Sequence, residues 1–359
     1  MKGQKDLEGG FATKNLQTFF DNTLIVIDSY TEYPYYQFNS TLEKMNQSPA
    51  IPDSYQELVT ELLDFKEKTI DKKEILAWKQ NRYVKYWLDV KSDPAKRTNL
   101  ANDFMNSESS RGASIGFPSG PIIINKFAYD LFEVTKEMNR ICKAIWKDGE
   151  CPTSIVMEPE CVSNSDFMES VLDWVQKEKS HTIFKIKNND LTKRTQTDRD
   201  RYRYFQEEIA RIKREENKIF MLLEAGPQAY PSAVLGFDVI STSLKAYDLD
   251  SQFGKSVYEG KGSWYDPQFL KLHNFGEVEQ IFKNFGKLPC PCEPCKQITS
   301  LEAITRDFWN VARRKHYILT MNRFMEEIRQ KIRERHIEQT REKLLTSEMC
   351  ILKTLIPTS

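Results

Sequence analysis

Four residues with metal-binding side chains lie close together in the last third of the sequence. Three thiols fall within six residues in a C-x-C-x₂-C arrangement, and a histidine follows after a spacer of 20 residues. The set is Cys290, Cys292, Cys295 and His316. Three thiolates and one imidazole complete the tetrahedral coordination of Zn²⁺, which is typical of a structural site. The spacing therefore predicts a structural zinc ion, with a cluster of free or redox-active thiols as the alternative.

The cysteine count and the charge restrict the class of protein. Seven cysteines in 359 residues is far below the density of a disulfide-stapled domain, so we expect a reducing, cytoplasmic location. The 52 basic and 52 acidic side chains cancel, so any affinity for a polyanion must be local. No apolar run approaches the roughly 18–20 residues of a membrane span, and the first residues lead into no apolar signal segment. We therefore expect no membrane partner.

Short apolar runs alternate with helix-length amphipathic stretches through the middle of the chain. The runs expected as buried strands are 23–28, 121–125, 154–157, 182–186, 219–223 and 237–240. Helices are expected between them over 126–146, 165–179 and 197–217. Strands that alternate with helices predict βαβ units and a parallel sheet. Both a (β/α)₈ barrel and a doubly wound sheet satisfy this pattern.

Composition divides the sequence into four parts. Residues 1–22 are polar and expected to be frayed, and residues 23–289 hold the expected strands. Within this second part, residues 246–289 are rich in Gly, aromatics and Asp and are expected to form a long loop or insertion. The zinc knuckle and a strongly helical basic segment span 290–345, and 346–359 form a C-terminal tail.

The cysteine–histidine arrangement and its surroundings resemble the zinc site of the tRNA-guanine transglycosylase superfamily, which includes DNA-directed members. The stretch His316–Arg329 is similar to the helix that follows the zinc histidine in that family. Gly236–Ser241 resembles its last barrel strand, and Ser154–Cys161 resembles a middle strand whose end contacts the base. The detailed similarity covers residues 150–335. It implies a (β/α)₈ TIM-type barrel with a zinc-binding subdomain near the C-terminus.

The resemblance also implies a reaction on nucleic acid. The family exchanges a guanine already in the polymer for a 7-deazaguanine base. One Asp attacks the sugar C1′ and holds the nucleic acid covalently while the bases exchange. A second Asp transfers protons to the leaving base and from the entering base. Because the target base must leave the stack to reach such a site, we expect tRNA or DNA and a 7-deazaguanine base as partners.

The position that corresponds to the family's nucleophile is not acidic in this chain. When Gly236 and Asp238 are aligned with the family's strand, the nucleophile falls on Ser241, and a shift by one residue moves it to Ile240. Asp238 is the nearest acid, but it becomes the nucleophile only if the strand slips, which turns a side chain to the other face. Two further acids in the next segment are alternative candidates, Asp248 and Asp250.

Other strand ends supply candidates for proton transfer and for base binding. Asp28 ends the first apolar run and precedes a serine, which resembles the family's Asp-Ser proton-transfer motif without the glycines that follow it. The base-binding candidates are Glu158, Glu160, Asn188 and Asn189. The two glutamates stand where a carboxylate recognises the base in the family, and the two asparagines offer amide contacts after the next strand. Because barrel active sites form at the carboxyl ends of strands, these residues share one expected face.

Two stretches are candidates for contact with the phosphate backbone. Residues 313–343 hold ten Lys or Arg against five Asp or Glu. A solvated helix with ion pairs between successive turns is the alternative. Residues 199–205 interleave Arg with Tyr and Phe, as stacking surfaces do, although acidic neighbours dilute that signal.

Three functions remain open at this level. The first is a guanine/7-deazaguanine base-exchange transglycosylase that acts on tRNA or DNA. The second is a non-catalytic, zinc-containing partner subunit or nucleic-acid-binding paralogue, favoured by the replacement at Ile240 and Ser241. Such a chain pairs with itself or with a catalytic sister subunit. The third is another reaction on the same base, as in the archaeosine-forming relatives.

Overall fold

A computed structural model of the chain describes residues 35, 52–64, 72–110, 112–187, 195–223, 232–234, 236–240, 264–268, 271–300 and 306–333. The chain divides into two compact units, Met1–Lys185 and Ile186–Ser359. This division falls inside the segment 23–289 that was expected to form a barrel. The expected domain boundaries therefore stay predictions.

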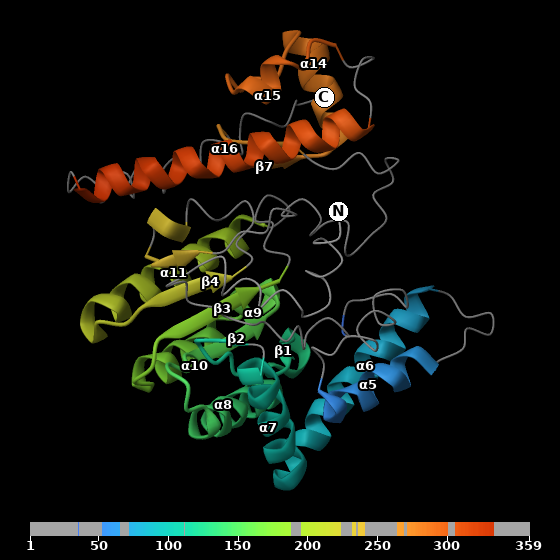
Figure 1. Ribbon diagram of the computed structural model, residues 1–359, viewed down its shortest axis with the longest axis vertical. Helices are drawn as coiled ribbons and strands as arrows, with labels where there is room; N and C mark the ends of the chain where they lie inside the picture. The colour runs from blue at the N-terminus through green and yellow to red at the C-terminus, as the bar shows by residue number, and fades with distance from the viewer. Residues whose placement is uncertain are drawn as a thin grey trace. The chain divides into compact units, whose positions relative to one another are not determined.

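Three helices open the described part of the first unit and pack around aromatic side chains. They are α5 (Asp53–Asp64), α6 (Lys72–Ser92) and α7 (Pro94–Ser110) (Figure 1). The rings of Tyr55 and Trp87 are fully buried, with centroids 5.9 Å apart, and Tyr55 also packs against Phe104 at 5.6 Å. The hydroxyl of Tyr83 on α6 accepts a hydrogen bond from the backbone N–H of Ile122, 2.9 Å away. This bond joins the helical layer to the first described strand.

The rest of the first unit alternates strands with helices, as the sequence predicts. The elements are β1 (Ile122–Ile123), η1 (Asn125–Phe127), α8 (Ala128–Ile145), β2 (Thr153–Met157), α9 (Pro159–Val162), α10 (Ser165–Lys177) and, at the unit boundary, β3 (Thr182–Ile186). Strands β1 and β2 are parallel, with Ile122 opposite Val156 and Ile123 opposite Met157. Every residue of β2 and β3 is buried, as expected for strands covered on both faces.

The second unit continues this alternation. It holds α11 (Gln196–Glu216), β4 (Phe220–Leu223) and β5 (Val239–Ile240). Helix α11 begins at a capping box of Thr195 and Asp198 and ends at Asn217, which adopts the left-handed φ of 51°. Strands β4 and β5 are parallel, with Leu222 opposite Ile240.

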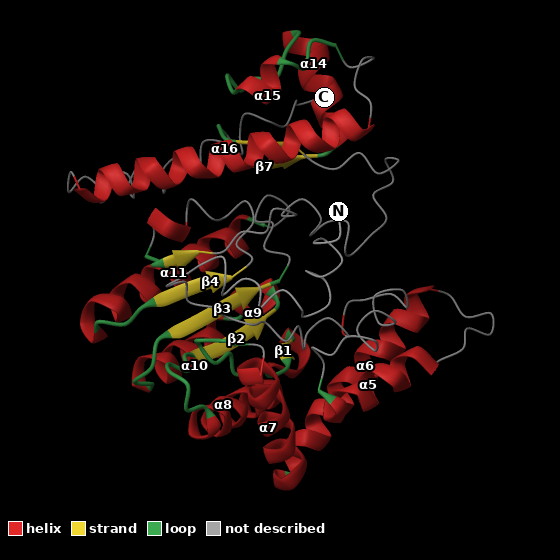
Figure 2. Ribbon diagram, in the orientation of Figure 1, coloured by secondary structure: helices red, strands yellow, loops and turns green. Residues whose placement is uncertain are grey.

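The five strands form one sheet in the order β1-β2-β3-β4-β5 (Figure 2). Each strand is hydrogen-bonded to its neighbour in the sequence, whereas a doubly wound sheet reverses its order at a switch point. The predicted α/β class with a parallel sheet is confirmed for the described residues. The eight-stranded barrel stays a prediction, and its expected first strand, 23–28, lies outside the described residues.

Residues 246–289 were expected to form a long loop or insertion, and the loop alternative is wrong in the described part. Strands β6 (Trp264–Asp266) and β7 (Lys271–His273) form an antiparallel hairpin, and helix α14 (Phe275–Phe285) follows. The helix begins at a capping box of Asn274 and Glu277 and ends at Gly286, whose φ of 67° favours glycine. An Asn followed three residues later by Glu, and a Gly at the far end, are the sequence signals of such a helix.

Two more helices complete the described part of this unit, α15 (Glu293–Lys296) and α16 (Arg306–Arg333). They enclose a core with the hairpin and α14. Its buried members are Trp264, Phe275, Val278, Phe282, Leu288, Cys290, Cys295, Ile298, Trp309 and Ala312. This core therefore surrounds the cysteine cluster. Across the described residues, every helix is too short or too polar to cross a bilayer.

Candidate functional site

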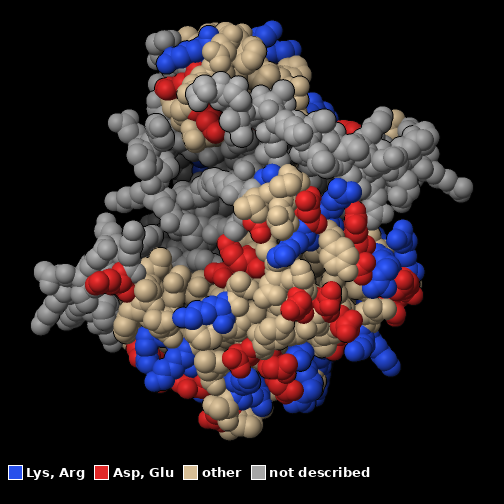
Figure 3. Space-filling model, turned by 180° about the vertical axis from the view of Figure 1, so that it is seen from behind, with Lys and Arg blue, Asp and Glu red and all other residues tan. Residues whose placement is uncertain are grey.

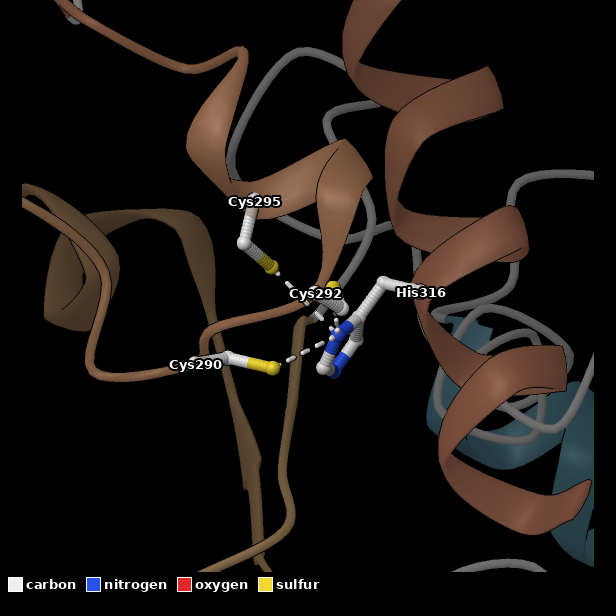
Figure 4. Close-up of side chains that lie close together, drawn as sticks. All are labelled: Cys290, Cys292, Cys295 and His316. Atoms are coloured by element: carbon white, nitrogen blue, oxygen red, sulfur yellow. Dashed lines mark hydrogen bonds between the residues drawn. The ribbon is translucent and has the colours of Figure 1, made fainter. Parts of the chain in front are cut away.

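The four predicted metal ligands converge on one point in the second unit (Figure 4). The sulfurs of Cys290, Cys292 and Cys295 lie 3.5, 3.2 and 3.3 Å from Nδ1 of His316. All four ligand atoms lie within 4.8 Å of one another. In a tetrahedral site with Zn–S bonds of ~2.3 Å and a Zn–N bond of ~2.0–2.1 Å, sulfur and nitrogen are about 3.6 Å apart. The cluster therefore fits one tetrahedral metal ion.

Local structure brings two of the cysteines together. Cys292 is the N-cap residue of α15, and the N–H of Lys296 donates to its carbonyl at 3.1 Å. Pro294 occupies the first turn of this helix. Backbone N–H groups in the first turn have no acceptor within the helix, so a proline there removes no helical hydrogen bond. Cys295 follows three residues after Cys292, a spacing that puts both side chains on one side of the turn. His316 comes from the middle of α16, so only the tertiary fold brings it to the cysteines.

A second contact of His316 determines which ring nitrogen can bind a metal. Its Nε2 lies 2.6 Å from the carbonyl oxygen of Tyr265 on β6 and donates its proton there. Nδ1 is then unprotonated and directs its lone pair toward the thiols. The indole of Trp264 stacks on the same imidazole with a centroid distance of 5.1 Å and an interplanar angle of 24°. The ring is fully buried and cannot turn without breaking both contacts.

When no metal is bound, deprotonation of one thiol disfavours deprotonation of the other two. The hydrogen bond between Cys290 and Cys295 lowers the pKa of Cys290 to about 4, with His316 contributing. The same bond, together with burial, raises the pKa of Cys295 well above its usual range. Burial also raises the pKa of Cys292. A bound dication supplies the charge that allows all three thiols to be thiolates.

The cluster is largely buried, with Cys292 half-buried. Cys290 and Cys295 are only 5% and 4% exposed, and Trp264, Phe275 and Trp309 belong to the core around them. Four protein ligands complete the coordination of a tetrahedral ion, so substrate and water have no position on it. An ion here would join the segment Cys290–Cys292, α15 and α16, and would act in stability rather than in catalysis.

A second buried histidine, His273, lies beside this centre and was not predicted from the sequence. Its ring stacks on Trp264 with a centroid distance of 6.1 Å. Its Nε2 lies 3.4 Å from a carboxylate oxygen of Asp266, and its Nδ1 lies 3.5 Å from one of Glu277. Because Trp264 also stacks on His316, this array supports the ligand ring from the hairpin side.

The carboxyl end of β2 carries the glutamates that were predicted to bind a base. Glu158 is half-buried directly after the strand, whereas Glu160 is exposed on α9. The N–H of Glu158 donates to the carbonyl of Ile123 at 2.9 Å, and the thiol of Cys161 donates to the same carbonyl at 3.3 Å. The Glu158 carboxylate is hydrogen-bonded to the hydroxyl of Tyr35. No local sequence pattern links Tyr35 to β2, from which it is separated by more than 100 residues.

Asp238, the candidate nucleophile, stands at the amino end of β5. Its carboxylate accepts a hydrogen bond from the N–H of Phe220 at 2.9 Å and forms an ion pair with Lys213. Its own N–H donates to the carbonyl of Phe220 at 2.8 Å. These contacts tie β5 to β4 and α11, and barrel active sites form at the opposite, carboxyl end of strands. The geometry favours a structural role for Asp238, and Ile240, the nucleophile position in the shifted alignment, is apolar.

The remaining predicted acids and amides lie outside the described residues. They are Asp28, Asn188, Asn189, Asp248 and Asp250, together with Ser241. Their assignments stay predictions.

Two arginines of α11 are engaged in ion pairs with acidic residues of the same helix. Arg203 pairs with Glu207, and Arg211 pairs with both Glu208 and Glu215. On the face of the molecule drawn in Figure 3, Lys and Arg are likewise interspersed with Asp and Glu. This pattern is typical of a solvated helix, and it weighs against the stacking surface suggested for residues 199–205.

The described part of the C-terminal basic stretch lies on α16 and leaves several cations exposed. Arg314, Lys315 and Arg323 are exposed, and the apolar side chains of Val311 and Leu319 are exposed beside them, 52% and 47%. A mixed basic and apolar helix face of this kind can contact phosphates and bases.

Comparison with known proteins adds no relative. No protein-family model, curated protein or solved structure matches this chain.

Proposed function

We propose that this chain is a zinc-stabilised transglycosylase-type protein that exchanges guanine for a 7-deazaguanine base in tRNA or DNA. The observation that carries the proposal is the closed Cys₃His centre, formed downstream of a parallel sheet whose strand β2 ends in a half-buried carboxylate, Glu158. The donor set suits Zn²⁺, because soft thiolates and an imidazole in tetrahedral geometry favour that ion.

The order of the strands supports the barrel part of the proposal. A sheet that winds in one direction with right-handed crossovers places its helices on one face and can close into a barrel. The order β1-β2-β3-β4-β5 is of this kind. With the predicted strand 23–28 and the residues between β5 and the hairpin, the chain is long enough for further strands.

The proposed reaction is a double displacement at the sugar C1′. A carboxylate attacks C1′ while the C1′–N9 bond breaks, and the bond electrons leave with guanine, which receives a proton from an acid. The entering base then loses its N9 proton and attacks C1′, which releases the carboxylate. We assign the proton transfer to Asp28 and the attack to Asp248 or Asp250. The zinc ion would hold the subdomain and take no part in these steps.

A covalent-trapping assay tests this proposal. Zinc-loaded, full-length protein is incubated with labelled tRNA or duplex DNA, with and without a 7-deazaguanine base, and run on a denaturing gel. We expect an adduct that Asp248→Ala or Asp250→Ala abolishes and that Asp238→Ala, the control, retains. The polymer that forms the adduct identifies the substrate. Loss of the adduct in Asp238→Ala alone, with an unchanged fold, would contradict our assignment of the nucleophile.

A second candidate function has its own support. The aligned nucleophile position is Ser241, or Ile240 after a shift by one residue, and neither is acidic. The nearest acid, Asp238, is engaged by Lys213 and Phe220. A non-catalytic partner subunit or nucleic-acid-binding paralogue needs the zinc centre and the basic helix but no nucleophile. Salt-sensitive binding of nucleic acid without any adduct, and activity only on addition of a catalytic sister chain, would favour this function.

A further inference from the structure

Helix α14 ends in an aromatic side chain that the core does not cover. Phe285, its last residue, is 70% exposed, the largest fraction among the large apolar side chains of the described residues. Phe282, three residues earlier, is buried and belongs to the core around the cysteine cluster. Residues three apart lie on one side of a helix. The apolar stripe of α14 therefore continues beyond the core, and its last ring is exposed to solvent.

Two lysines flank this ring in the sequence. Residues 283–287 are all exposed, and they are Lys283, Asn284, Phe285, Gly286 and Lys287. Among the residues that the structure describes, neither lysine makes an ion pair or a side-chain hydrogen bond. The end of α14 thus presents one aromatic ring between two cations that no acid neutralises in the described part of the chain.

The turn that carries the ring is anchored on both sides. The N–H of Gly286 donates to the carbonyl of Phe282 at 2.7 Å, and the φ of 67° at Gly286 favours glycine. Leu288 then returns to the core, and Cys290, the first metal ligand, follows two residues later. A side chain built on Gly286 would meet no atom within 4 Å, so that side of the turn is open. A turn that is ordered before a ligand arrives lowers the entropic cost of binding.

We propose that Phe285, Lys283 and Lys287 bind an unpaired stretch of nucleic acid, with one base stacked on the ring and the neighbouring phosphates contacted by the ammonium groups. The inference rests on the nucleic-acid part of the proposed function and adds a contact on the subdomain that holds the metal ligands. Every base has a π-face, so stacking on one ring tolerates any sequence. The two cations complement the charge of the phosphate backbone. Since bases in a duplex stack on their neighbours, the ring selects unpaired nucleotides.

A membrane surface is the other partner that attracts aromatic and basic side chains together, and α14 is poorly suited to it. A helix that lies on a bilayer inserts a continuous apolar face. The apolar residues Phe275, Val278 and Phe282 of α14 are buried inside the protein. One ring buries little area in a lipid layer, whereas one ring is enough to stack on a base. The geometry therefore favours nucleic acid.

Fluorescence anisotropy on the full-length, zinc-loaded protein tests the inference. The probes are a labelled single strand of about 15 nucleotides, as RNA and as DNA, and the same strands in a duplex. We expect the wild type to prefer the single strands, and Phe285→Ala and Phe285→Leu each to weaken their binding about tenfold. Phe285→Trp keeps the affinity, because it retains a stacking face. Since the side chain is exposed, these variants leave the Tm and the zinc content unchanged.

The lysines and a matched control are measured in the same way. Replacing Lys283 and Lys287 together by Ala lowers the slope of log affinity against log salt for a single strand by about 1.4, with ~0.7 from each lost phosphate contact. Tyr129→Ala is the control, because Tyr129 on α8 is also a strongly exposed aromatic residue, 53%. This control keeps the wild-type affinity and slope.

Three results would overturn the inference. They are a wild type that binds no single strand, a Phe285→Leu variant that binds as tightly as the wild type, and a Tyr129→Ala variant that loses as much affinity as Phe285→Ala. It is also overturned if Phe285 matters only for binding to vesicles of phosphatidylserine and phosphatidylcholine, because the turn is then a membrane contact.

The covalent-trapping assay on the same proteins separates this inference from the function on which it rests. A wild-type adduct that Phe285→Ala forms as readily, at unchanged affinity, overturns the role of Phe285 while the proposed reaction stands. Binding that depends on Phe285 without any adduct supports the inference and contradicts the base-exchange reaction.

Discussion

His316 and Tyr265, separated by 51 positions in the sequence, are joined by a hydrogen bond of 2.6 Å from the imidazole Nε2 to the backbone carbonyl. Tyr317, the next residue along α16, packs edge-on against the ring of Tyr265, with ring centroids 5.5 Å apart. The same hairpin residue therefore contacts two consecutive residues of the helix. The bond selects Nδ1 as the metal-binding atom. Because its acceptor is a backbone atom, substitutions of the Tyr265 side chain do not remove it directly.

Loss of one thiol should release the metal. We expect Cys292→Ser to purify with far less than the about one zinc ion per chain of the wild type and to lose about 3 kcal/mol or more of stability. The reason is that three ligands hold the ion less tightly and leave buried thiols without their counter-charge. Metal analysis and thermal unfolding measure the two effects. Cys151→Ser is the matched control, because Cys151 is also half-buried but lies outside the cluster. Equal zinc content in both variants would contradict the site.

The stacking of Trp264 on His316 should tune the affinity for the metal. Trp264→Phe reduces the aromatic surface that stacks on the imidazole of His316. We expect zinc affinity to fall about tenfold, as measured by competition with a chelator. Trp309→Phe is the control, since Trp309 is equally buried in the same core. If both substitutions weaken zinc binding equally, the effect is one of general packing, and the specific role of Trp264 is refuted.

Asp238 should contribute to stability and not to chemistry. We expect Asp238→Ala to cost about 2 kcal/mol, because it leaves the Phe220 N–H without its charged acceptor. Lys213→Ala should cost less than about 1 kcal/mol, since that ion pair is partly exposed. Urea unfolding measures both values. A larger effect from Lys213 than from Asp238 would show that the ion pair, and not the backbone bond, carries the stability.

The exposed cations of α16 should carry part of any binding to nucleic acid. We expect Arg314→Ala and Lys315→Ala each to weaken binding to tRNA or duplex DNA and to reduce the slope of log affinity against log salt by about 1. Titrations at several salt concentrations provide the slope. Arg211→Ala on α11 is the control, because Arg211 is paired with Glu208 and Glu215. An equal change of slope in this control would argue against a specific role for α16.

The pH dependence of stability should report the buried thiol of Cys151. Burial raises its pKa from the usual 9.0 to about 12, so the folded state binds this proton more tightly than the unfolded state does. The resulting stability is complete below pH 9 and is lost as the pH rises from 9 toward 12. Wild-type protein should lose about 1 kcal/mol per pH unit more than Cys151→Ser in this range. The free energy of unfolding of both proteins is measured by denaturant unfolding. If the wild type and Cys151→Ser lose stability equally between pH 9 and 12, this thiol does not titrate as its burial requires.

Short-range patterns account for what the sequence alone could predict. The C-x-C-x₂-C spacing and a later histidine identified all four ligands, because a proline-rich turn brings close thiols together whatever lies around it. The apolar runs placed β2 and β3 within a residue or so, because a buried parallel strand is a continuous apolar segment. The thiol spacing and the apolar strands depend on neighbours a few residues away, so they can be recognised in the sequence, whereas His316 reaches the cysteines only through the fold.

The tertiary structure decided what depends on distant parts of the chain. It selected Nδ1 of His316 through Tyr265, directed Tyr35 to Glu158 and engaged Asp238 with Phe220. Each pair is brought together by the path of the backbone, and no local pattern records it. An Asp in a sequence is a candidate nucleophile, but only its hydrogen-bond partners in the fold show whether its charge is already in use. The chemistry of the ligands was therefore set by residue type and spacing, and the roles of the acids by long-range packing.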